Sequence, residues 1–174
     1  MVKRTGSPTV ATVTAGKVGG VAPRILVIEA RFYEDIADAL VEGAVAEIEA
    51  SGGTCERISV PGALEIPQVL AQAVAAGYIP RTAAAARFDG AVVLGCVIRG
   101  ETSHYDIVCN NANHWLMDVA MRHAIPLGNG ILTVETAEQA MARARGGREG
   151  KGGDAARACL AMIAVARAVQ GQEA

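Results

Sequence analysis

The sequence predicts an α/β protein, a three-layer α/β/α sandwich with a four-stranded parallel sheet. Short apolar runs alternate with stretches of helical periodicity along the 174 residues, and this alternation is typical of parallel strands joined by helices. The run from Gly90 to Ile98 is apolar on both faces, as expected in the middle of such a sheet. Although 51% of the residues are hydrophobic, only 3% are aromatic, so alanine and glycine favour close packing of helices on the sheet.

The first half of the chain supplies two strands and two helices. A strand is expected over 24–30, a helix over 35–50, a strand over 54–60 and a helix over 66–76. The first helix ends at Gly52-Gly53 and has apolar residues at helical spacing: Ile36, Leu40, Ala44 and Ile48. The second ends at Gly77, and the Tyr78–Phe88 segment is a loop or a helix extension.

The second half repeats the alternation. A strand is expected over 90–98, a helix over 103–123, a strand over 125–133, and helices over 135–145 and 154–169. Asp154 is the expected N-cap of the last helix. Four side chains are expected on one apolar face of the helix over 103–123: Val108, Ala112, Trp115 and Val119.

Composition and charge narrow the class of protein. The net charge of −2 gives no general basic field for nucleic acid or an anionic membrane, and no apolar run is long enough to cross a bilayer. The four cysteines lack the usual zinc-ligand spacing and fit a reducing compartment, so we expect a cytoplasmic protein without a metal. We expect residues 1–22 to form a flexible N-terminal arm and residues 23–174 to form a single domain.

The turn after the run over 90–98 is unusually rich in polar groups. It reads Arg99-Gly100-Glu101-Thr102-Ser103-His104, at a strand end where parallel sheets bind ligands. Ser103 with Asp106 resembles a capping box, so a helix is expected to begin here and to offer its N-terminal N–H groups to a phosphate. The alternative is an ordinary capped helix with a surface histidine, and the carboxylate of Glu101 argues mildly against an anion.

Three further candidates each allow two interpretations. Phe32, one of only two phenylalanines, is either a core residue or a surface on which a flat heterocycle stacks. Glu65 lies between two prolines and is either a rigidly held acceptor for hydroxyl or N–H groups or an acid favoured at a helix N-terminus. The basic stretch over 143–154 is either a solvated surface or, through Arg143, a bidentate phosphate site.

Together these turns resemble the lumazine synthase family, whose members make 6,7-dimethyl-8-ribityllumazine in riboflavin biosynthesis. Two long motifs carry the resemblance: Val60-Pro61-Gly62-Ala63-Leu64-Glu65-Ile66-Pro67 and Gly95-Cys96-Val97-Ile98-Arg99-Gly100-Glu101-Thr102-Ser103-His104-Tyr105-Asp106. Shorter matches follow in the family's order: Gly130-Ile131-Leu132-Thr133, Glu138-Gln139-Ala140, Arg143-Ala144 and Lys151-Gly152. The similarity runs from Arg24 to the end of the chain and implies a flavodoxin-like topology.

The resemblance implies a role for each matching residue. His104 corresponds to the proton-transfer residue, Phe32 to the residue that stacks on the pyrimidine of 5-amino-6-(D-ribitylamino)uracil, and Glu65 to the acceptor of ribityl hydroxyls. The resemblance also implies a pyrimidine edge formed by Val97 and Ile98, a turn for the phosphate of 3,4-dihydroxy-2-butanone 4-phosphate formed by Gly100, Glu101 and Thr102, a phosphate-binding Arg143, and further substrate contacts at Ala63, Leu64, Asn129 and Lys151.

The resemblance further implies a homopentamer whose sites lie between subunits, with Arg143, Lys151 and the region of Asn129 supplied by the neighbour. It also implies that the two substrates condense to the lumazine, phosphate and water without a cofactor, and that the product passes to riboflavin synthase. Two positions depart from the family, because Tyr33 stands where Asn is common and Asn129 where Phe is frequent.

Three other functions remain open. Lys151 suits a Schiff-base lyase or aldolase, which borohydride trapping on that lysine would reveal. A non-catalytic flavin or lumazine binder would hold riboflavin tightly without turnover, and a structural shell protein would need no site. The enzyme is favoured over the last two by a complete set of candidate site residues: Phe32, Glu65, Thr102, His104 and Arg143.

Overall fold

The computed structural model describes residues 21–80, 82, 83 and 85–170, so the predicted arm over 1–22 lies almost wholly outside the described residues. None of the described helices is both long and apolar enough to cross a membrane. The elements in chain order are β1 (Arg24–Ala30), α1 (Glu34–Ala50), β2 (Thr54–Val60), the 3₁₀ turn η1 (Ala63–Glu65), α2 (Ile66–Ala75), β3 (Gly90–Ile98), α3 (His104–Arg122), β4 (Leu127–Val134), α4 (Ala137–Ala144), the 3₁₀ turn η2 (Gly147–Glu149) and α5 (Lys151–Val169).

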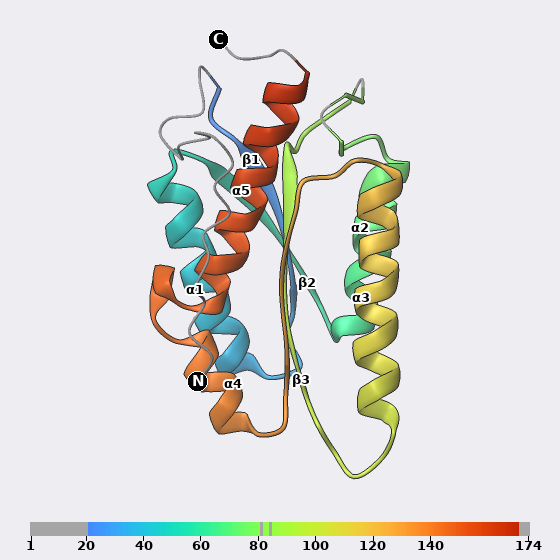
Figure 1. The fold of residues 1–174 in the computed structure, drawn as a ribbon, viewed down its shortest axis with the longest axis vertical. Coiled ribbons are helices and arrows are strands. Elements are labelled where there is room, and N and C mark those ends of the chain that lie inside the picture. Colours follow the sequence, from blue (N-terminus) through green and yellow to red (C-terminus); the bar gives the residue numbers. More distant parts are fainter. Residues whose placement is uncertain (1–20, 81, 84, 171–174) are drawn as a thin grey trace.

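The four strands form one parallel sheet in the order β2-β1-β3-β4. Figure 1 shows α1, α4 and α5 on one face of this sheet and α2 and α3 on the other. The predicted three-layer sandwich is therefore confirmed, and the strand order is the flavodoxin-like one, with β1 and β3 adjacent at its centre. The carboxyl ends of all four strands meet at the edge where β3 turns into α3 and β4 into α4.

Each face of the sheet has its own core. Ile25 and Val27 of β1 pack towards α1 and α5, whereas Leu26 and Ile28 pack towards α2 and α3. All four side chains are buried, because β1 lies between β2 and β3 and is covered by helices on both sides. Burial on both faces explains why the central strands read as continuous apolar runs rather than alternating ones.

Glycine lets α5 approach the backbone of its neighbours directly. A Cβ atom added at Gly128 of β4 would collide with the carbonyl oxygen of Ala155, and one added at Gly152 would collide with the carbonyl oxygen of Leu40 in α1. A side chain at Gly128 would push α5 away from β4, and one at Gly152 would push it away from α1. The low aromatic content thus corresponds to a core of aliphatic side chains, in which glycines let α5 lie close to β4 and α1.

Two local predictions about helices and one about the start of a strand differ from the structure. Helix α5 begins at Lys151, three residues before Asp154, because Gly150 takes the extended N-cap conformation. Asp154 instead accepts hydrogen bonds from Lys151 (Nζ–Oδ2, 2.6 Å) and Arg157 (Nη2–Oδ1, 2.8 Å). Trp115 is 51% exposed, since the buried face of α3 runs through Ala112, Leu116 and Ala120. Strand β4 begins at Leu127 rather than at residue 125.

The segment after α2 is a loop rather than a helix extension. Ile79 and Phe88 are buried in the core between the sheet and α2 and α3. The guanidinium of Arg87 lies 5.0 Å from the ring centroid of Tyr78 and donates to Glu56 of β2 (Nη2–Oε2, 2.9 Å). The described part of the loop is therefore tied to the core and to the outer strand.

Stability is expected to fall above roughly pH 9, in part through the buried thiol of Cys159. Burial raises the pKa of Cys159 to about 12, and its Sγ donates to the carbonyl oxygen of Pro126 at 3.5 Å. An unfolded cysteine loses its proton near pH 8.5, so the unfolded chain is stabilised first as the pH rises, by up to about 1.4 kcal/mol per pH unit. In denaturant unfolding between roughly pH 9 and 11, the free energy of unfolding should fall less steeply with pH for Cys159→Ser than for the wild type.

Cys55, which lies on the outer strand β2 and is only partly buried, provides the control for this measurement. Burial also raises its pKa, but the smaller burial predicts a smaller change of slope for Cys55→Ser. An identical slope in the wild type and in Cys159→Ser would contradict the assignment to Cys159.

Candidate functional site

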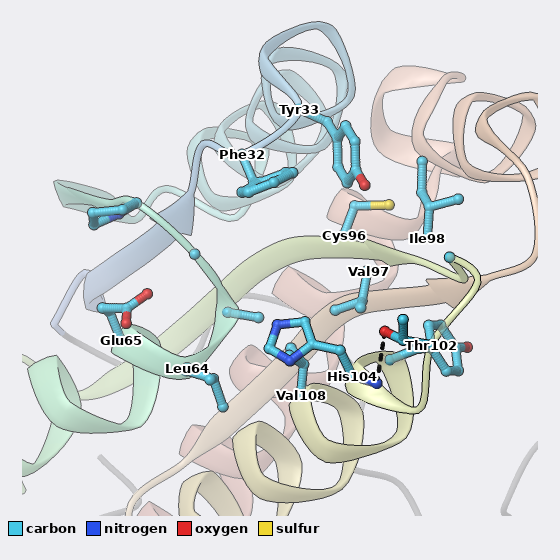
Figure 2. A pocket seen from close by; sticks show the side chains of 15 residues that line it. Phe32, Tyr33, Leu64, Glu65, Cys96, Val97, Ile98, Thr102, His104 and Val108 are labelled. Carbon is cyan, nitrogen blue, oxygen red and sulfur yellow. Dashed lines mark hydrogen bonds between the residues drawn. The ribbon is translucent and has the colours of Figure 1, made fainter.

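A cavity of about 390 Å³ opens at the carboxyl edge of the sheet. Its walls come from the turn between β1 and α1, from η1, from the end of β3 and from the first turns of α3 (Figure 2). This edge is where open parallel sheets bind ligands, and the volume suits a small molecule. The lining residues are Phe32, Tyr33, Pro61, Gly62, Ala63, Leu64, Glu65, Cys96, Val97, Ile98, Gly100, Thr102, His104, Tyr105 and Val108.

Most of the predicted site residues therefore meet in one cavity, although they are spread over more than seventy positions of sequence. Those that line it are Phe32, Ala63, Leu64, Glu65, Val97, Ile98, Gly100, Thr102 and His104. Their convergence follows from the topology: β1 and β3 are neighbours, and the segment after β2 folds back over the same edge.

Phe32 is not a core residue. Its side chain is 72% exposed, whereas Phe88, the other phenylalanine, is 4% exposed in the core. The Phe32 ring meets the ring of Tyr33 edge to face, with centroids 4.9 Å apart and planes at 70°. An aromatic face in a cavity wall is suited to stacking on a flat heterocycle, so the geometry favours the second of the two interpretations.

Glu65 ends η1 and occupies the N-cap position of α2, but its side chain makes no capping hydrogen bond. Its carboxylate lines the cavity instead. Pro67 lies in the first turn of α2. A backbone N–H at this position would have no partner within the helix, so the proline costs no hydrogen bond, and its ring fixes the backbone. The position therefore presents an acceptor pair to the cavity on a short, constrained segment.

His104 is the first residue of α3, and its imidazole faces the cavity beside Leu64 and Val108 (Figure 2). Its backbone N–H lies 3.4 Å from Oγ1 of Thr102. The expected capping box is absent: the Ser103 side chain makes no capping hydrogen bond, and Asp106 pairs with Arg99 instead. The start of α3 is therefore not covered by a Ser103 cap, which suits an incoming anion.

Arg99 braces the turn between β3 and α3. Its guanidinium carbon lies 3.9 Å from the ring centroid of Tyr105, its Nη2 is 3.2 Å from Oδ1 of Asp106, and its Nε is 3.1 Å from Oε2 of Glu135. Each exposed ion pair contributes little on its own, but three contacts on one planar group fix its orientation. This arrangement joins the end of β3, the first turn of α3 and the end of β4.

Four predicted site residues do not line this cavity: Glu101, Asn129, Arg143 and Lys151. Asn129, on the edge strand β4, donates to Oδ1 of Asn113 in α3 at 2.7 Å. Arg143 lies on α4, on the opposite face of the sheet, and donates to the carbonyl oxygen of Gln139. The Lys151 Nζ is held by Asp154. Within one chain these residues are separate from the cavity.

Six residues that line the cavity were not among the predicted site residues: Tyr33, Pro61, Gly62, Cys96, Tyr105 and Val108. Burial raises the pKa of Cys96 to about 11, so its thiol is uncharged at neutral pH and forms part of the apolar wall. Helical spacing offered one signal, since Val108 lies four residues after His104 on the same face of α3.

The fold and the cavity define a class, an open α/β protein with a small-molecule site at the carboxyl edge of its sheet. In the described part of the chain, no three His, Cys, Asp or Glu side chains are grouped to hold a metal ion. The site therefore offers an aromatic face, one carboxylate, one imidazole and the start of a helix as its chemical groups.

Comparison with known proteins identifies the family. A sequence model of 6,7-dimethyl-8-ribityllumazine synthase matches residues 22–167. The chain is 54% identical over 144 residues to 6,7-dimethyl-8-ribityllumazine synthase 1 of Rhodopseudomonas palustris, covering 83% of this chain and 86% of that protein. It is 51% identical over 149 residues to 6,7-dimethyl-8-ribityllumazine synthase of Agrobacterium fabrum, covering 86% and 98%. This chain belongs to the 6,7-dimethyl-8-ribityllumazine synthase family.

Proposed function

We propose that the chain condenses 5-amino-6-(D-ribitylamino)uracil with 3,4-dihydroxy-2-butanone 4-phosphate to give 6,7-dimethyl-8-ribityllumazine, phosphate and water, the penultimate step of riboflavin biosynthesis. One observation carries the proposal: the two long motifs that define the family resemblance, one ending β2 and one ending β3, wall a single cavity together with Phe32. Family membership supports the same reaction.

In the proposed complex, Phe32 stacks on the pyrimidine, Glu65 accepts ribityl hydroxyls, and the backbone of Val97 and Ile98 meets the pyrimidine edge. The cavity geometry supports this division, because Phe32 and Glu65 lie on the walls contributed by β1 and η1 while the end of β3 forms the floor between them. Ala63 and Leu64 close the same wall as Glu65.

The phosphate of the second substrate is proposed to bind at the start of α3. Gly100 and Thr102 line the cavity there, and the helix N-terminus carries partial positive charge. Glu101 is exposed and is not part of the lining, so its backbone rather than its carboxylate is the proposed contact.

The nucleophile of the proposed reaction belongs to a substrate. The 5-amino group attacks the ketone and water leaves to form an imine, phosphate is then eliminated, and ring closure with loss of a second water gives the lumazine. The protein has to hold two substrates in register, which replaces a large entropic barrier. His104 is proposed to move protons between these steps, because an imidazole exchanges protons near neutral pH.

A homopentamer with shared sites is part of the proposal. The proposed substrate contacts at Arg143, Lys151 and Asn129 lie outside the cavity of their own chain, so a neighbour has to supply them. The outer face of α3 also exposes several large apolar side chains that suit contact with another subunit: Ile107, Trp115, Met117 and Met121. Closed cyclic symmetry would give every site the same neighbour.

The remaining parts of the proposal concern the chain as a whole. Residues 23–174 are proposed to form a single domain preceded by an arm over 1–22, which is supported by the family match beginning at residue 22. All four cysteines are free, which supports a cytoplasmic enzyme. No cofactor is proposed, and the product is proposed to pass to riboflavin synthase.

The direct test mixes the protein with both substrates and records lumazine absorbance together with released phosphate. Equal amounts of both products are expected, and phosphate release without lumazine would overturn the proposal. Sodium borohydride distinguishes a Schiff-base lyase, because it would attach a substrate to Lys151. Within its own chain Lys151 lies outside the cavity and its Nζ contacts Asp154, so any such adduct would form on Lys151 of a neighbouring chain.

Arg143→Ala is expected to weaken the butanone phosphate far more than the uracil. Loss of a charge-assisted bidentate contact costs about 1.5–3 kcal/mol, equivalent to a roughly 10- to 150-fold higher KM for that substrate. Steady-state kinetics with each substrate varied in turn measures the split, and inorganic phosphate should compete less well with the variant.

Arg122 provides the control for this substitution, because its partner Asp118 lies one turn earlier on α3 and the guanidinium is exposed. Arg122→Ala should leave both KM values close to those of the wild type. Equal weakening of both substrates by Arg143→Ala would instead assign Arg143 a structural role.

A further inference from the structure

The carboxylate of Glu29 is buried inside the sheet layer, although it lies only three residues before Phe32 in sequence. Its side chain is 1% exposed. Acidic side chains are almost never buried to this extent unless they are paired, because removing a charge from water carries a large desolvation cost. Both of its oxygens are paired here, with partners on β2 and in the turn after β1.

Hydrogen bonds link Glu29 directly to β2 and to the turn after β1, and through Arg31 to α1. Oε1 accepts hydrogen bonds from Arg57 (Nη2, 2.7 Å; Nε, 3.0 Å) and from Ser59 (Oγ, 3.2 Å), both on β2. Oε2 accepts from Nη1 of Arg31 at 2.9 Å. The other arm of the Arg31 guanidinium, Nη2, donates to Oδ1 of Asp38 on α1 at 2.7 Å.

Arg31 is the residue immediately before Phe32, so these contacts fix the backbone that carries the ring. The Arg31 side chain is held by Glu29 on one side and Asp38 on the other, and its backbone N–H donates to the carbonyl oxygen of Val60 at 3.0 Å. The Phe32 ring itself is exposed, and among the described residues its aromatic contact is with Tyr33. Core packing therefore does not determine where this ring points.

We propose that Glu29 is a positioning residue for the heterocycle site: through Arg31 it holds the turn after β1 so that Phe32 presents its face to the cavity. This inference rests on the proposed function, because it requires a flat ring as the ligand of Phe32. A buried ion pair is weak evidence for a role in stability, since apolar residues of similar volume often serve as well. A fixed orientation of the turn is a use that such apolar residues would not supply.

The test measures binding rather than turnover, with 5-amino-6-(D-ribitylamino)uracil and inorganic phosphate as separate calorimetric probes. Glu29→Gln places an amide N–H group against either Arg31 or Arg57, and Arg31→Ala removes the link itself. Each variant is expected to bind the uracil about tenfold more weakly, which corresponds to part of the binding free energy of a stacked ring. Phosphate binding should stay unchanged. Arg31→Lys keeps a positive charge beside Glu29 and should recover part of the affinity.

Arg87→Gln is the matched control. It also removes an arginine–carboxylate pair, the one between Arg87 and Glu56 of β2, but this pair lies outside the cavity. It should change neither binding constant. Thermal unfolding of every variant identifies any that fail to fold, and Arg31→Ala, whose side chain is partly exposed, carries the test if Glu29→Gln does not fold.

A double-mutant comparison separates positioning from general structural support. In a Phe32→Ala background, Glu29→Gln should cause no further loss of uracil affinity, because the ring that it positions is gone. A further tenfold loss in that background, or equal weakening of uracil and phosphate, would overturn the positioning role. If the wild-type protein bound no uracil at all, both the proposed function and the positioning role would be wrong. Unchanged uracil binding in a folded Arg31→Ala variant would contradict only the positioning role.

Discussion

Replacing His104 with alanine is expected to lower turnover by a factor of roughly 10² to 10⁴, the usual contribution of a positioned acid–base group. The imidazole faces the cavity from the first turn of α3, next to the proposed phosphate turn, which is where protons have to move as the imine forms and phosphate leaves. The calorimetric affinity for the uracil should change little, because Phe32 and Glu65 are still present.

The two other histidines provide the control for that experiment. His114 meets Trp115 edge to face on α3, and His123 follows the end of the same helix, so neither lines the cavity. His114→Ala and His123→Ala should retain turnover. A His104→Ala enzyme with wild-type turnover between pH 6 and pH 8 would remove this histidine from the mechanism.

Mixing two inactive variants is expected to restore activity. In the proposed ring, a Phe32→Ala chain still offers Arg143 to its neighbour, and an Arg143→Ala chain still has an intact cavity. In rings assembled at random from equal amounts, roughly a quarter of the interfaces combine two wild-type halves. After co-refolding, the specific activity should therefore rise from near zero to about a quarter of the wild-type value.

A second mixture tests whether the recovered activity comes from shared sites. Phe32 and His104 line the same cavity of the same chain, so every interface in a mixture of Phe32→Ala and His104→Ala contains one damaged half. This mixture should remain inactive. Recovery in both mixtures, or sedimentation of an active monomer, would refute the shared site.

The sequence predicted the elements best where a pattern extends over many residues. The apolar run of β3 and the periodicity of α1 leave little choice of structure, and both were placed within a residue or two. The capping box predicted at Ser103 failed because a four-residue pattern cannot reveal that Asp106 has a competing partner in Arg99, seven positions earlier. The start of α5 failed similarly, since Asp154 forms ion pairs within the helix instead of capping it.

The cavity was predictable to the extent that strand ends meet at one edge of a parallel sheet. This rule brought Phe32, Glu65 and His104 together from three separate turns, and the structure places them in one cavity. It gave no information about Tyr33, because the orientation of this side chain depends on how the β1–α1 turn folds over the end of β3. The burial of Glu29 was equally hidden, since its partners on β2 lie about thirty residues away in sequence.

The close approach of α5 to β4 and α1 has a consequence for local unfolding of these three elements. The carbonyl of Ala155 in α5 lies against Gly128 of β4, and Gly152 of α5 lies against the carbonyl of Leu40 in α1, so no side chain separates the backbones at these two points. A side chain at either glycine would place a Cβ atom in those contacts. Amide protons of α5, β4 and the adjoining part of α1 should therefore exchange with solvent through one shared opening event, with one common free energy, rather than by separate fraying of each element.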